Sequence, residues 1–255
     1  MSFKVVIPAR LASTRLPRKV LRDIGGRPLI AWVVDAARRS GAEEVILAVD
    51  DAEVEAVAAD FGIPVVMTKP EHPSGTDRIH EVAVRRDWPG DTIVVNVQGD
   101  EPLMPPELIS NAAQLLANDP QADIATLCHP LHALEEWLDP NVVKLVRDAR
   151  GRALYFSRAP IPWQRDGASR STPKLPTEPP LRHIGIYAYR VAALKHFAAL
   201  PPAPLEQVEA LEQLRALWNG LTILAGVVEQ SPPRGVDTEE DLAAVIAYLT
   251  PASGA

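Results

Sequence analysis

Residues 3–21 read FKVVIPARLASTRLPRKVL, and this stretch contains the pattern that decides the fold. It starts with a short β-branched run from Val5 to Ile7, which is typical of a strand buried on both faces of a sheet. Pro8 ends the run, and the segment that follows holds four cations: Arg10, Arg15, Arg18 and Lys19. The stretch therefore predicts a buried strand whose carboxyl end opens into a basic loop.

The same alternation continues through the first half of the chain. Short apolar runs predict further strands at Val45–Val49, Val65–Met67 and Ile93–Val97. Between the strands, apolar residues recur every three or four positions, which predicts amphipathic helices at Leu29–Arg39, Glu53–Phe61 and Asp77–Arg86. Strands that alternate with helices predict an α/β fold with a mostly parallel sheet flanked by helices. Ligands bind beyond the carboxyl ends of such strands, so the loops there are the candidate site.

The pattern changes after about residue 119. Apolar runs predict strands at Asp123–Cys128, Val142–Val146, Ala153–Phe156 and Ile184–Tyr189, which we interpret as an inserted antiparallel portion. A helix is expected at Leu205–Leu217, then a strand at Leu221–Val228 and a last helix at Glu239–Tyr248, with Thr238 as its N-cap. Residues 162–180 hold five prolines without periodicity, which predicts a mobile loop of the kind that forms lids.

Composition excludes several classes of protein. The 255 residues include 26 Lys plus Arg against 33 Asp plus Glu, a formal net charge of −7, so long-range attraction to nucleic acid or anionic lipid is not expected. No apolar run approaches the roughly 20 residues of a membrane span, and the first residues lack a signal-peptide pattern. Cys128 is the single cysteine, which excludes an intramolecular disulfide and favours a reducing compartment. We therefore expect a cytoplasmic protein.

The basic loop after the first strand differs from the common phosphate-binding loops. Walker A and dinucleotide loops need several glycines, and PARLASTRLPRK contains none. Its hydroxyl at Ser13 and its cations Arg10, Arg15 and Lys19 can instead donate charge-assisted hydrogen bonds to a polyphosphate. A solvated basic loop would show the same composition, but the position at a strand end favours the binding role.

Three other stretches place polar residues at strand ends or helix starts. In VNVQGDEP, residues 95–102, Gln98 and Asp100 follow a buried strand, Gly99 permits close backbone approach, and Asp100 is suited to Mg²⁺. An ordinary acidic turn is the alternative interpretation. Asp237 in GVDTEED and the Ser74-Gly75 pair in SGTDR each precede a predicted helix, where plain helix caps are also common. The six histidines lack metal-ligand spacing, so no zinc site is predicted.

Taken in order, seven motifs resemble one family. They are IPARLASTRLP, SGTDR, VNVQGDEP, ALYFSRAPIPW, RHIGIYAYR, LEQVEALEQLRALW and GVDTEEDL, and they extend from about Phe3 to Leu249. The chain resembles the 3-deoxy-manno-octulosonate cytidylyltransferases, also called CMP-KDO synthetases. The resemblance implies a Rossmann-like nucleotidyltransferase fold and a homodimer. It also implies transfer of CMP from CTP to the eight-carbon acid sugar KDO, with release of pyrophosphate, for the inner core of lipopolysaccharide.

The resemblance also implies roles for individual residues. Lys19, Arg15, Asp100 and Asp237 would be catalytic, and Asp100 and Asp237 would bind Mg²⁺. The nucleotide would be bound by Pro8, Ala9, Arg10, Ser13, Arg15, Lys19, Ser74, Gly75, Gln98 and Asp100. KDO would be bound by Arg158, His183, Tyr187, Glu212 and Gln213.

The same resemblance divides the expected single domain, residues 1–255, into three parts. Residues 1 to about 120 would bind the nucleotide, about 121–220 would bind the sugar and form the dimer, and 221–250 would return to the main sheet. The resemblance also implies that many family members have glycine at the position of Arg18. Because this chain has arginine there, we expect the position not to require a positive φ.

The expected reaction is an in-line attack by the anomeric hydroxyl of the sugar on the α-phosphorus of CTP, with one or two Mg²⁺ ions. Such transfers depend on positioning and charge neutralisation, so no protein nucleophile is required. Two alternatives stay open at this point. One is a cytidylyltransferase for a related sugar acid, such as sialic acid or 8-amino-KDO, of which the motifs after Ala153 disfavour sialic acid. The other is a nucleotide-binding regulator that has lost catalysis.

Overall fold

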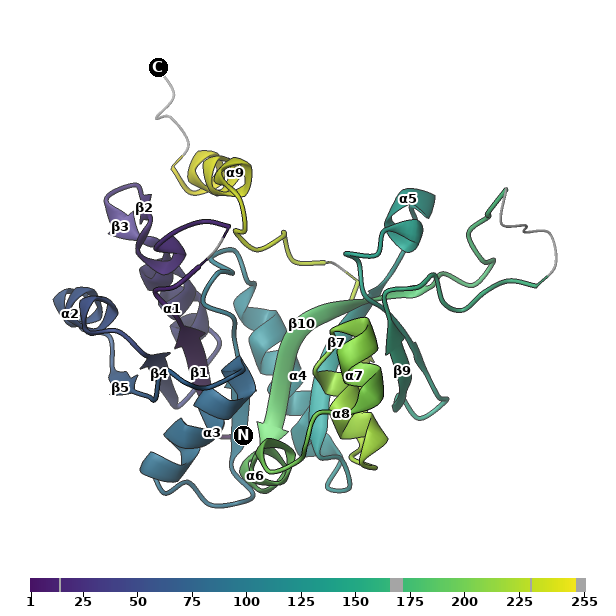
Figure 1. The fold of residues 1–255 in the computed structure, drawn as a ribbon, viewed down its shortest axis with the longest axis horizontal. Helices are drawn as coiled ribbons and strands as arrows, with labels where there is room; N and C mark the ends of the chain where they lie inside the picture. The colour runs from purple at the N-terminus through teal and green to yellow at the C-terminus, as the bar shows by residue number, and fades with distance from the viewer. Residues whose placement is uncertain (14, 166–171, 230, 251–255) are drawn as a thin grey trace.

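A single mixed sheet runs through the molecule. The computed structural model describes residues 1–13, 15–165, 172–229 and 231–250. The sheet has nine strands, and its main path is β11-β7-β10-β6-β1-β4-β5 (Figure 1). The strands of this path are β1 (Lys4–Ala9), β4 (Glu44–Val49), β5 (Val65–Met67), β6 (Ile93–Asn96), β7 (Ile124–Pro130), β10 (Leu181–Arg190) and β11 (Ile223–Val227).

Most strand pairs of the main path are parallel. β1 pairs in parallel with β4 on one side and with β6 on the other, and β5 and β11 are parallel to their neighbours. The exception is β10, which is antiparallel to β6 and β7. It also pairs antiparallel with β8 (Lys144–Arg147), which in turn pairs with β9 (Ala153–Ser157). The expected α/β fold with an inserted antiparallel portion is confirmed.

Two hydrophobic cores lie on opposite faces of the sheet. Successive residues of a strand point to opposite faces, and accordingly Val5 and Ile7 belong to one core and Val6 to the other. The first core includes side chains of α1 (Leu29–Arg39), α2 (Ala52–Asp60) and α4 (Pro106–Asn118). The second includes side chains of α3 (Gly75–Arg85), α6 (Val191–Ala198) and α8 (Gln213–Trp218). The continuous apolar run of β1 follows from its burial on both faces.

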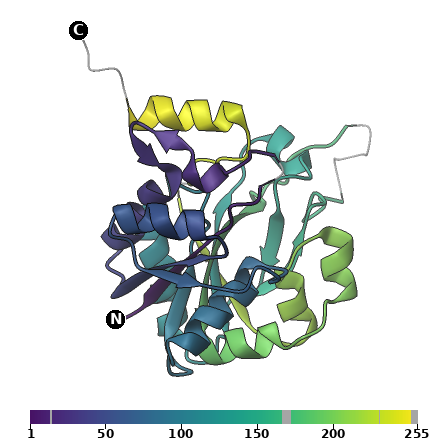
Figure 2. The same cartoon turned by 60° about the vertical axis from the view of Figure 1, so that its left-hand side comes forward.

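The last helix closes the end of the sheet at which the parallel strands finish. α9 (Glu239–Leu249) starts at Thr238, whose side chain accepts from the Asp241 amide, so the predicted N-cap is confirmed. Both views show α9 above the small hairpin of β2 (Asp23–Ile24) and β3 (Arg27–Pro28) (Figures 1 and 2). α9 begins two residues after Asp237, which places that carboxylate at this end of the sheet.

The helix predicted at Leu205–Leu217 is wrong as one continuous element. The structure has α7 (Pro204–Glu209) and α8, separated at Ala210, which adopts the left-handed conformation with φ 50° and ψ 50°. Leu211 directly after the break is buried in the second core, together with Leu214 of α8. Packing of both leucines offsets the cost of about 1–2 kcal/mol for a left-handed non-glycine residue.

The expectation for Arg18 is also wrong. Arg18 adopts φ 56° and ψ 30° directly before the 3-10 helix η1 (Lys19–Leu21). This turn directs the chain from the basic loop into η1, and the position therefore uses the positive φ that glycine favours. The Arg18 guanidinium forms an ion pair with Glu53 of α2, and both side chains are exposed. An exposed pair of this kind contributes about 0–1 kcal/mol.

The predicted lid lies partly outside the described residues, because 166–171 are among those not described. In the adjoining described part, the indole of Trp163 stacks on that of Trp137 from α5 (Leu134–Leu138), with centroids 5.7 Å apart. Among the described residues, no helix is both long and apolar enough to cross a membrane.

Candidate active site

Three charged side chains meet where β1, β6 and the segment before α9 end. The amine Nζ of Lys19 lies 2.6 Å from Asp100 Oδ2 and 3.0 Å from Asp237 Oδ1. Arg15 adds a second cation, with its guanidinium 3.0 Å from the same oxygen of Asp237. The Val236 amide donates to the Asp100 carbonyl at 2.8 Å, which joins the two acidic segments through their backbones.

The protonation state of Lys19 is set by these neighbours. Its side chain is only 13% exposed, and burial by itself disfavours the charged amine. The charges of Asp100 and Asp237 and their hydrogen bonds outweigh that effect, so the pKa of Lys19 is raised above its ordinary value. Lys19 is therefore a cation throughout the physiological pH range.

A cavity of about 430 Å³ opens in front of this cluster. Most of the residues predicted to bind the nucleotide line it: Pro8, Arg10, Ser13, Arg15, Lys19, Ser74, Gly75, Gln98 and Asp100. Ala9 is fully buried in the first core behind them. The predicted close approach at Gly99 is present, because a Cβ on this residue would lie 2.8 Å from the Pro8 carbonyl oxygen.

The opposite wall of the cavity comes from the start of α3. Ser74 is the N-cap of this helix and accepts from the Asp77 amide at 3.2 Å. Arg10 is held toward this wall, since its guanidinium donates to the His72 carbonyl at 2.8 Å. Cations from the basic loop therefore face the positive end of a helix across the cavity, an arrangement that favours an anion.

Asp100 and Asp237 fit a magnesium ion by their chemistry. Two carboxylates that share one cation lie close together, and Mg²⁺ is usually held by one or two carboxylates plus substrate phosphates. Within the described part of the chain, no group of three or more His, Cys, Asp or Glu side chains could hold a metal. A site of this type would need oxygens from the substrate to complete it.

Glu101 belongs to the polar cluster after β6, but the sequence analysis assigned no role to it. Its Oε2 is buried without a hydrogen-bond partner among the described residues. Burial, with a smaller effect from Asp100, raises the pKa of Glu101 to about 8. A carboxyl group next to another acid in a short turn is a common surface pattern, so nothing in the sequence distinguished it.

The residues predicted to bind the sugar are brought together only in part. Tyr187, Glu212 and Gln213 line a second cavity of about 60 Å³, along with Gln98 and Thr76. The Thr76 hydroxyl donates to Glu212 Oε2 at 3.0 Å. The Tyr187 hydroxyl and Glu212 Oε1 are buried without partners among the described residues, and burial raises the pKa of both groups. These are polar atoms available to a ligand.

His183 lies beside this cavity. Its ring centroid is 5.2 Å from that of Tyr187 and 5.2 Å from that of Phe156. Its Nε2 lies 2.9 Å from the Thr126 hydroxyl. Burial, followed by the charge of Arg182, lowers the pKa of His183 to about 3, so the imidazole is neutral at physiological pH.

Arg158, the remaining predicted sugar ligand, lies at the end of β9. Its guanidinium donates to the backbone carbonyls of Glu209 at 2.7 Å, Pro140 at 2.9 Å and Ala210 at 3.4 Å. It is thus attached to the α7–α8 turn, which leads directly to Glu212 and Gln213.

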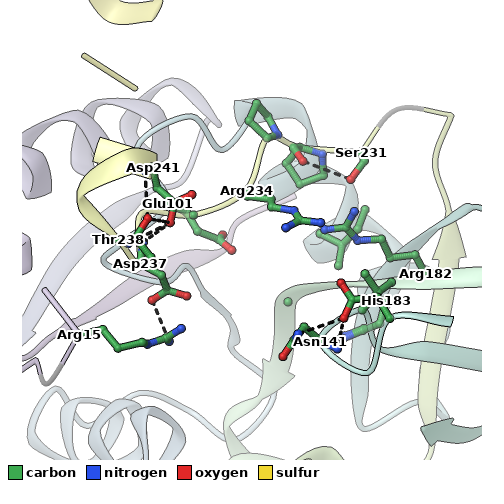
Figure 3. A pocket seen from close by; sticks show the side chains of 17 residues that line it. Arg15, Glu101, Asn141, Arg182, His183, Ser231, Arg234, Asp237, Thr238 and Asp241 are labelled. Carbon is green, nitrogen blue, oxygen red and sulfur yellow. Dashed lines mark hydrogen bonds and ion pairs between the residues drawn. The ribbon is translucent and has the colours of Figure 1, made fainter. Parts of the chain in front are cut away.

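A third cavity, of about 600 Å³, adjoins the charged cluster. Figure 3 shows Arg15 and Asp237 on one side of it and Arg182, His183 and Asn141 on the other. Arg15 and Asp237 line both this cavity and the one of about 430 Å³, so the two are adjacent. Arg182 and Arg234 in its wall were not singled out from sequence, because isolated arginines have no distinctive spacing.

Comparisons with known proteins agree on one family. The family model described as cytidylyltransferase matches residues 4–223. A protein of Nitrosococcus oceani named 3-deoxy-manno-octulosonate cytidylyltransferase is 52% identical over 244 residues, which are 95% of this chain and 94% of that relative. One of Herminiimonas arsenicoxydans with the same name is 52% identical over 251 residues, 98% of this chain and 100% of the relative.

Solved structures show the same fold. A CMP:2-keto-3-deoxy-manno-octonic acid synthetase complexed with CTP aligns with a TM-score of 0.87 and 40% identity, covering 97% of this chain and 98% of that one. A cytidylyltransferase from Leptospira borgpetersenii shares the fold with a TM-score of 0.60 at 15% identity, over 96% of this chain and 85% of that one. The chain therefore belongs to the 3-deoxy-manno-octulosonate cytidylyltransferases within the cytidylyltransferase family, and is a nucleotidyltransferase.

Proposed function

We propose that this enzyme transfers CMP from CTP to the anomeric hydroxyl of KDO, giving CMP-KDO and pyrophosphate. The observation that supports this most directly is the Lys19 amine held between Asp100 and Asp237 at the edge of a cavity of about 430 Å³. That cavity has cations for a triphosphate and two carboxylates for a divalent ion. The names of the relatives supply the choice of CTP and KDO.

The triphosphate would lie against the basic loop. Arg10, Arg15 and Lys19 converge on the cavity from this loop, while Ser74 and Gly75 line its other wall, where the nucleoside would lie together with Gln98. Lys19 and Arg15 would neutralise the charge that develops on the departing pyrophosphate. Both are already oriented by Asp100 and Asp237, so little reorganisation is needed during the reaction.

Asp100 and Asp237 would hold Mg²⁺, which supplies neutralisation of phosphate charge and a lower pKa for the attacking hydroxyl. The oxygen of that hydroxyl would form the new bond to the α-phosphorus, the bond from the α-phosphorus to the pyrophosphate oxygen would break, and the hydroxyl proton would pass to solvent water. The chain's own contribution is to bring the two substrates together in line, which by itself lowers the barrier substantially.

The sugar acid would be recognised by Tyr187, Glu212 and Gln213, with His183 and Arg158 nearby. The cavity of about 60 Å³ has room for only a few waters, and so would accept hydroxyl groups of the sugar rather than the whole molecule. The Tyr187 hydroxyl and Glu212 Oε1 are buried without hydrogen-bond partners among the described residues, and they would form hydrogen bonds with these hydroxyls of the sugar. Arg158 would attract the carboxylate of the sugar.

We further propose that the enzyme is a cytoplasmic homodimer whose product supplies the inner core of lipopolysaccharide. These statements rest on the family resemblance.

Pyrophosphate release tests the activity. With CTP, KDO and MgCl₂ present, the expected result is release that requires all three, together with a product of the mass of CMP-KDO. Release that does not depend on KDO, or no release, would contradict the proposal. An assay with equal concentrations of KDO and 8-amino-KDO identifies the preferred sugar. If the enzyme uses only the amino sugar, the amino sugar and not KDO is the substrate.

A further inference from the structure

Arg158 is held at both of its backbone polar groups by charged side chains. Its amide donates to Glu209 Oε2 at 2.9 Å, and its carbonyl accepts from Lys144 Nζ at 2.6 Å. Neither partner belongs to the residues assigned above to the nucleotide or the sugar. The backbone of this residue, directly after β9, is therefore fixed by the side chains of Glu209 and Lys144.

Glu209 makes most of the connections. Its carboxylate also accepts from the Ser157 hydroxyl at 2.6 Å and from the Tyr155 hydroxyl at 3.4 Å. Its carbonyl accepts from Arg158 Nε at 2.7 Å. Glu209 is the last residue of α7, and the left-handed Ala210 that follows also accepts from Arg158. One glutamate thus joins the end of β9 to the α7–α8 turn.

Lys144 supports the same unit from β8. It is fully buried and donates to the carbonyls of Asp139 at 2.9 Å, Val142 at 2.6 Å and Arg158 at 2.6 Å. Burial is the main cause that lowers the pKa of Lys144, and the charges of Asp139 and then of Glu209 oppose that effect. A buried lysine without a carboxylate in direct contact is costly, and three carbonyls offset that cost by satisfying its three donors.

The charges of this unit do not cancel at Arg158. Among the described residues, the guanidinium donates to the backbone carbonyls of Pro140, Glu209 and Ala210. The Glu209 carboxylate is engaged instead by the Ser157 hydroxyl and the Arg158 amide. The guanidinium is thus oriented by neutral groups and keeps its full charge for an anionic ligand.

We infer that Glu209 is a positioning residue for the acid sugar, an inference that rests on the proposed function. Glu209 holds Arg158 and the turn that presents Glu212 and Gln213 in one arrangement before the sugar binds. The sugar's carboxylate and hydroxyls then meet groups that are already ordered, which reduces the entropy cost of binding. The nucleotide cavity shares no residue with this unit, so binding of CTP is not affected.

Steady-state kinetics of Glu209→Ala and Glu209→Gln test this inference. Loss of the half-buried carboxylate, which accepts from the Arg158 amide and most closely from the Ser157 hydroxyl, is expected to raise the KM for KDO about tenfold in Glu209→Ala. The KM for CTP is expected to stay unchanged. Glu209→Gln keeps the size of the side chain and an oxygen that can accept from the Arg158 amide, but it removes the charge and turns an NH₂ toward the Ser157 hydroxyl, so a smaller selective rise is expected. It is the variant to use if Glu209→Ala does not fold.

Tyr155→Phe is the matched control, because it removes only the hydroxyl at 3.4 Å from the same carboxylate, and both KM values should stay unchanged.

The outcomes separate this inference from the proposed function. An unchanged KM for KDO in both Glu209 variants, or an equal rise in both KM values, overturns the positioning role. Arg158→Ala is measured in parallel. If it raises the KM for KDO while the Glu209 variants do not, the sugar site stands and only the positioning role fails. If Arg158→Ala leaves the KM for KDO unchanged, the proposed sugar site fails, and the inference with it.

Discussion

Lys19 and Asp100, 81 residues apart in the sequence, are joined by an ion pair of 2.6 Å between Nζ and Oδ2. The pair connects the loop after β1 with the loop after β6, and these strands are neighbours in the sheet. Asp237, at 3.0 Å from the same amine, brings in a third segment from the far end of the chain. The charges proposed for catalysis are thus oriented by one another.

Replacing Lys19 with Met should reduce kcat strongly. The substitution removes the cation that we expect to neutralise the departing pyrophosphate, at a cost of about 3 kcal/mol of transition-state stabilisation or about a hundredfold in rate. Initial rates of pyrophosphate release at saturating CTP and KDO measure this. An unchanged kcat would show that the basic loop does not contact the phosphates during the reaction.

Asp100→Asn and Asp237→Asn should each abolish turnover while the protein stays folded. Each variant removes one of the two carboxylates proposed to bind Mg²⁺, yet leaves Lys19 paired with the other. The rate of CMP-KDO formation at a series of Mg²⁺ concentrations measures turnover, and thermal unfolding shows whether the protein is folded. Glu239→Gln is the matched control, because Glu239 is an exposed acid near Asp237 that pairs with Arg22. Normal CMP-KDO formation by either Asp variant would remove that residue from the metal site.

His183 should make the protein less stable as the pH falls below about 6.5. Its folded pKa of about 3 lies below the unfolded value, so the unfolded state binds a proton first on acidification. The contribution of the neutral imidazole to the free energy of unfolding is fully present above the unfolded pKa. Between the unfolded and the folded pKa it is lost at up to about 1.4 kcal/mol per pH unit. Urea unfolding at pH 7.5, 6 and 5 of wild type and His183→Gln measures the difference. Parallel pH dependences in the two proteins would contradict the assignment.

Two substitutions at Arg18 test the left-handed conformation. Arg18→Gly should change the free energy of unfolding by less than about 1 kcal/mol, since glycine fits this conformation and the lost ion pair with Glu53 is exposed. Arg18→Val should destabilise by about 1–2 kcal/mol more, because β-branched residues fit a positive φ poorly. Chemical denaturation measures both. Equal stability of the two variants would mean that the turn relaxes to a negative φ.

Local patterns predicted much of the fold. The run at Val5–Ile7 and its neighbours have the β-branched composition of strands buried on both faces, and β1, β4, β5 and β6 were placed within a few residues. α4 was not placed, and the helix predicted at Leu205–Leu217 is divided at Ala210. That division could not be read from sequence, because alanine favours helices and only the burial of Leu211 and Leu214 in a tertiary core outweighs its preference.

For the site, the sequence by itself determined the chemical groups and the end of the sheet at which they lie. A parallel sheet brings all loops at the carboxyl ends of its strands to one edge, so Arg15, Lys19 and Asp100 could be placed there from their positions after strands. Only the tertiary structure decided which side chains contact each other. The contact of Asp237 with Lys19 and the attachment of Arg158 to Glu209 depend on the packing of segments distant in sequence. Such contacts leave no periodic pattern, because each is made by a single side chain.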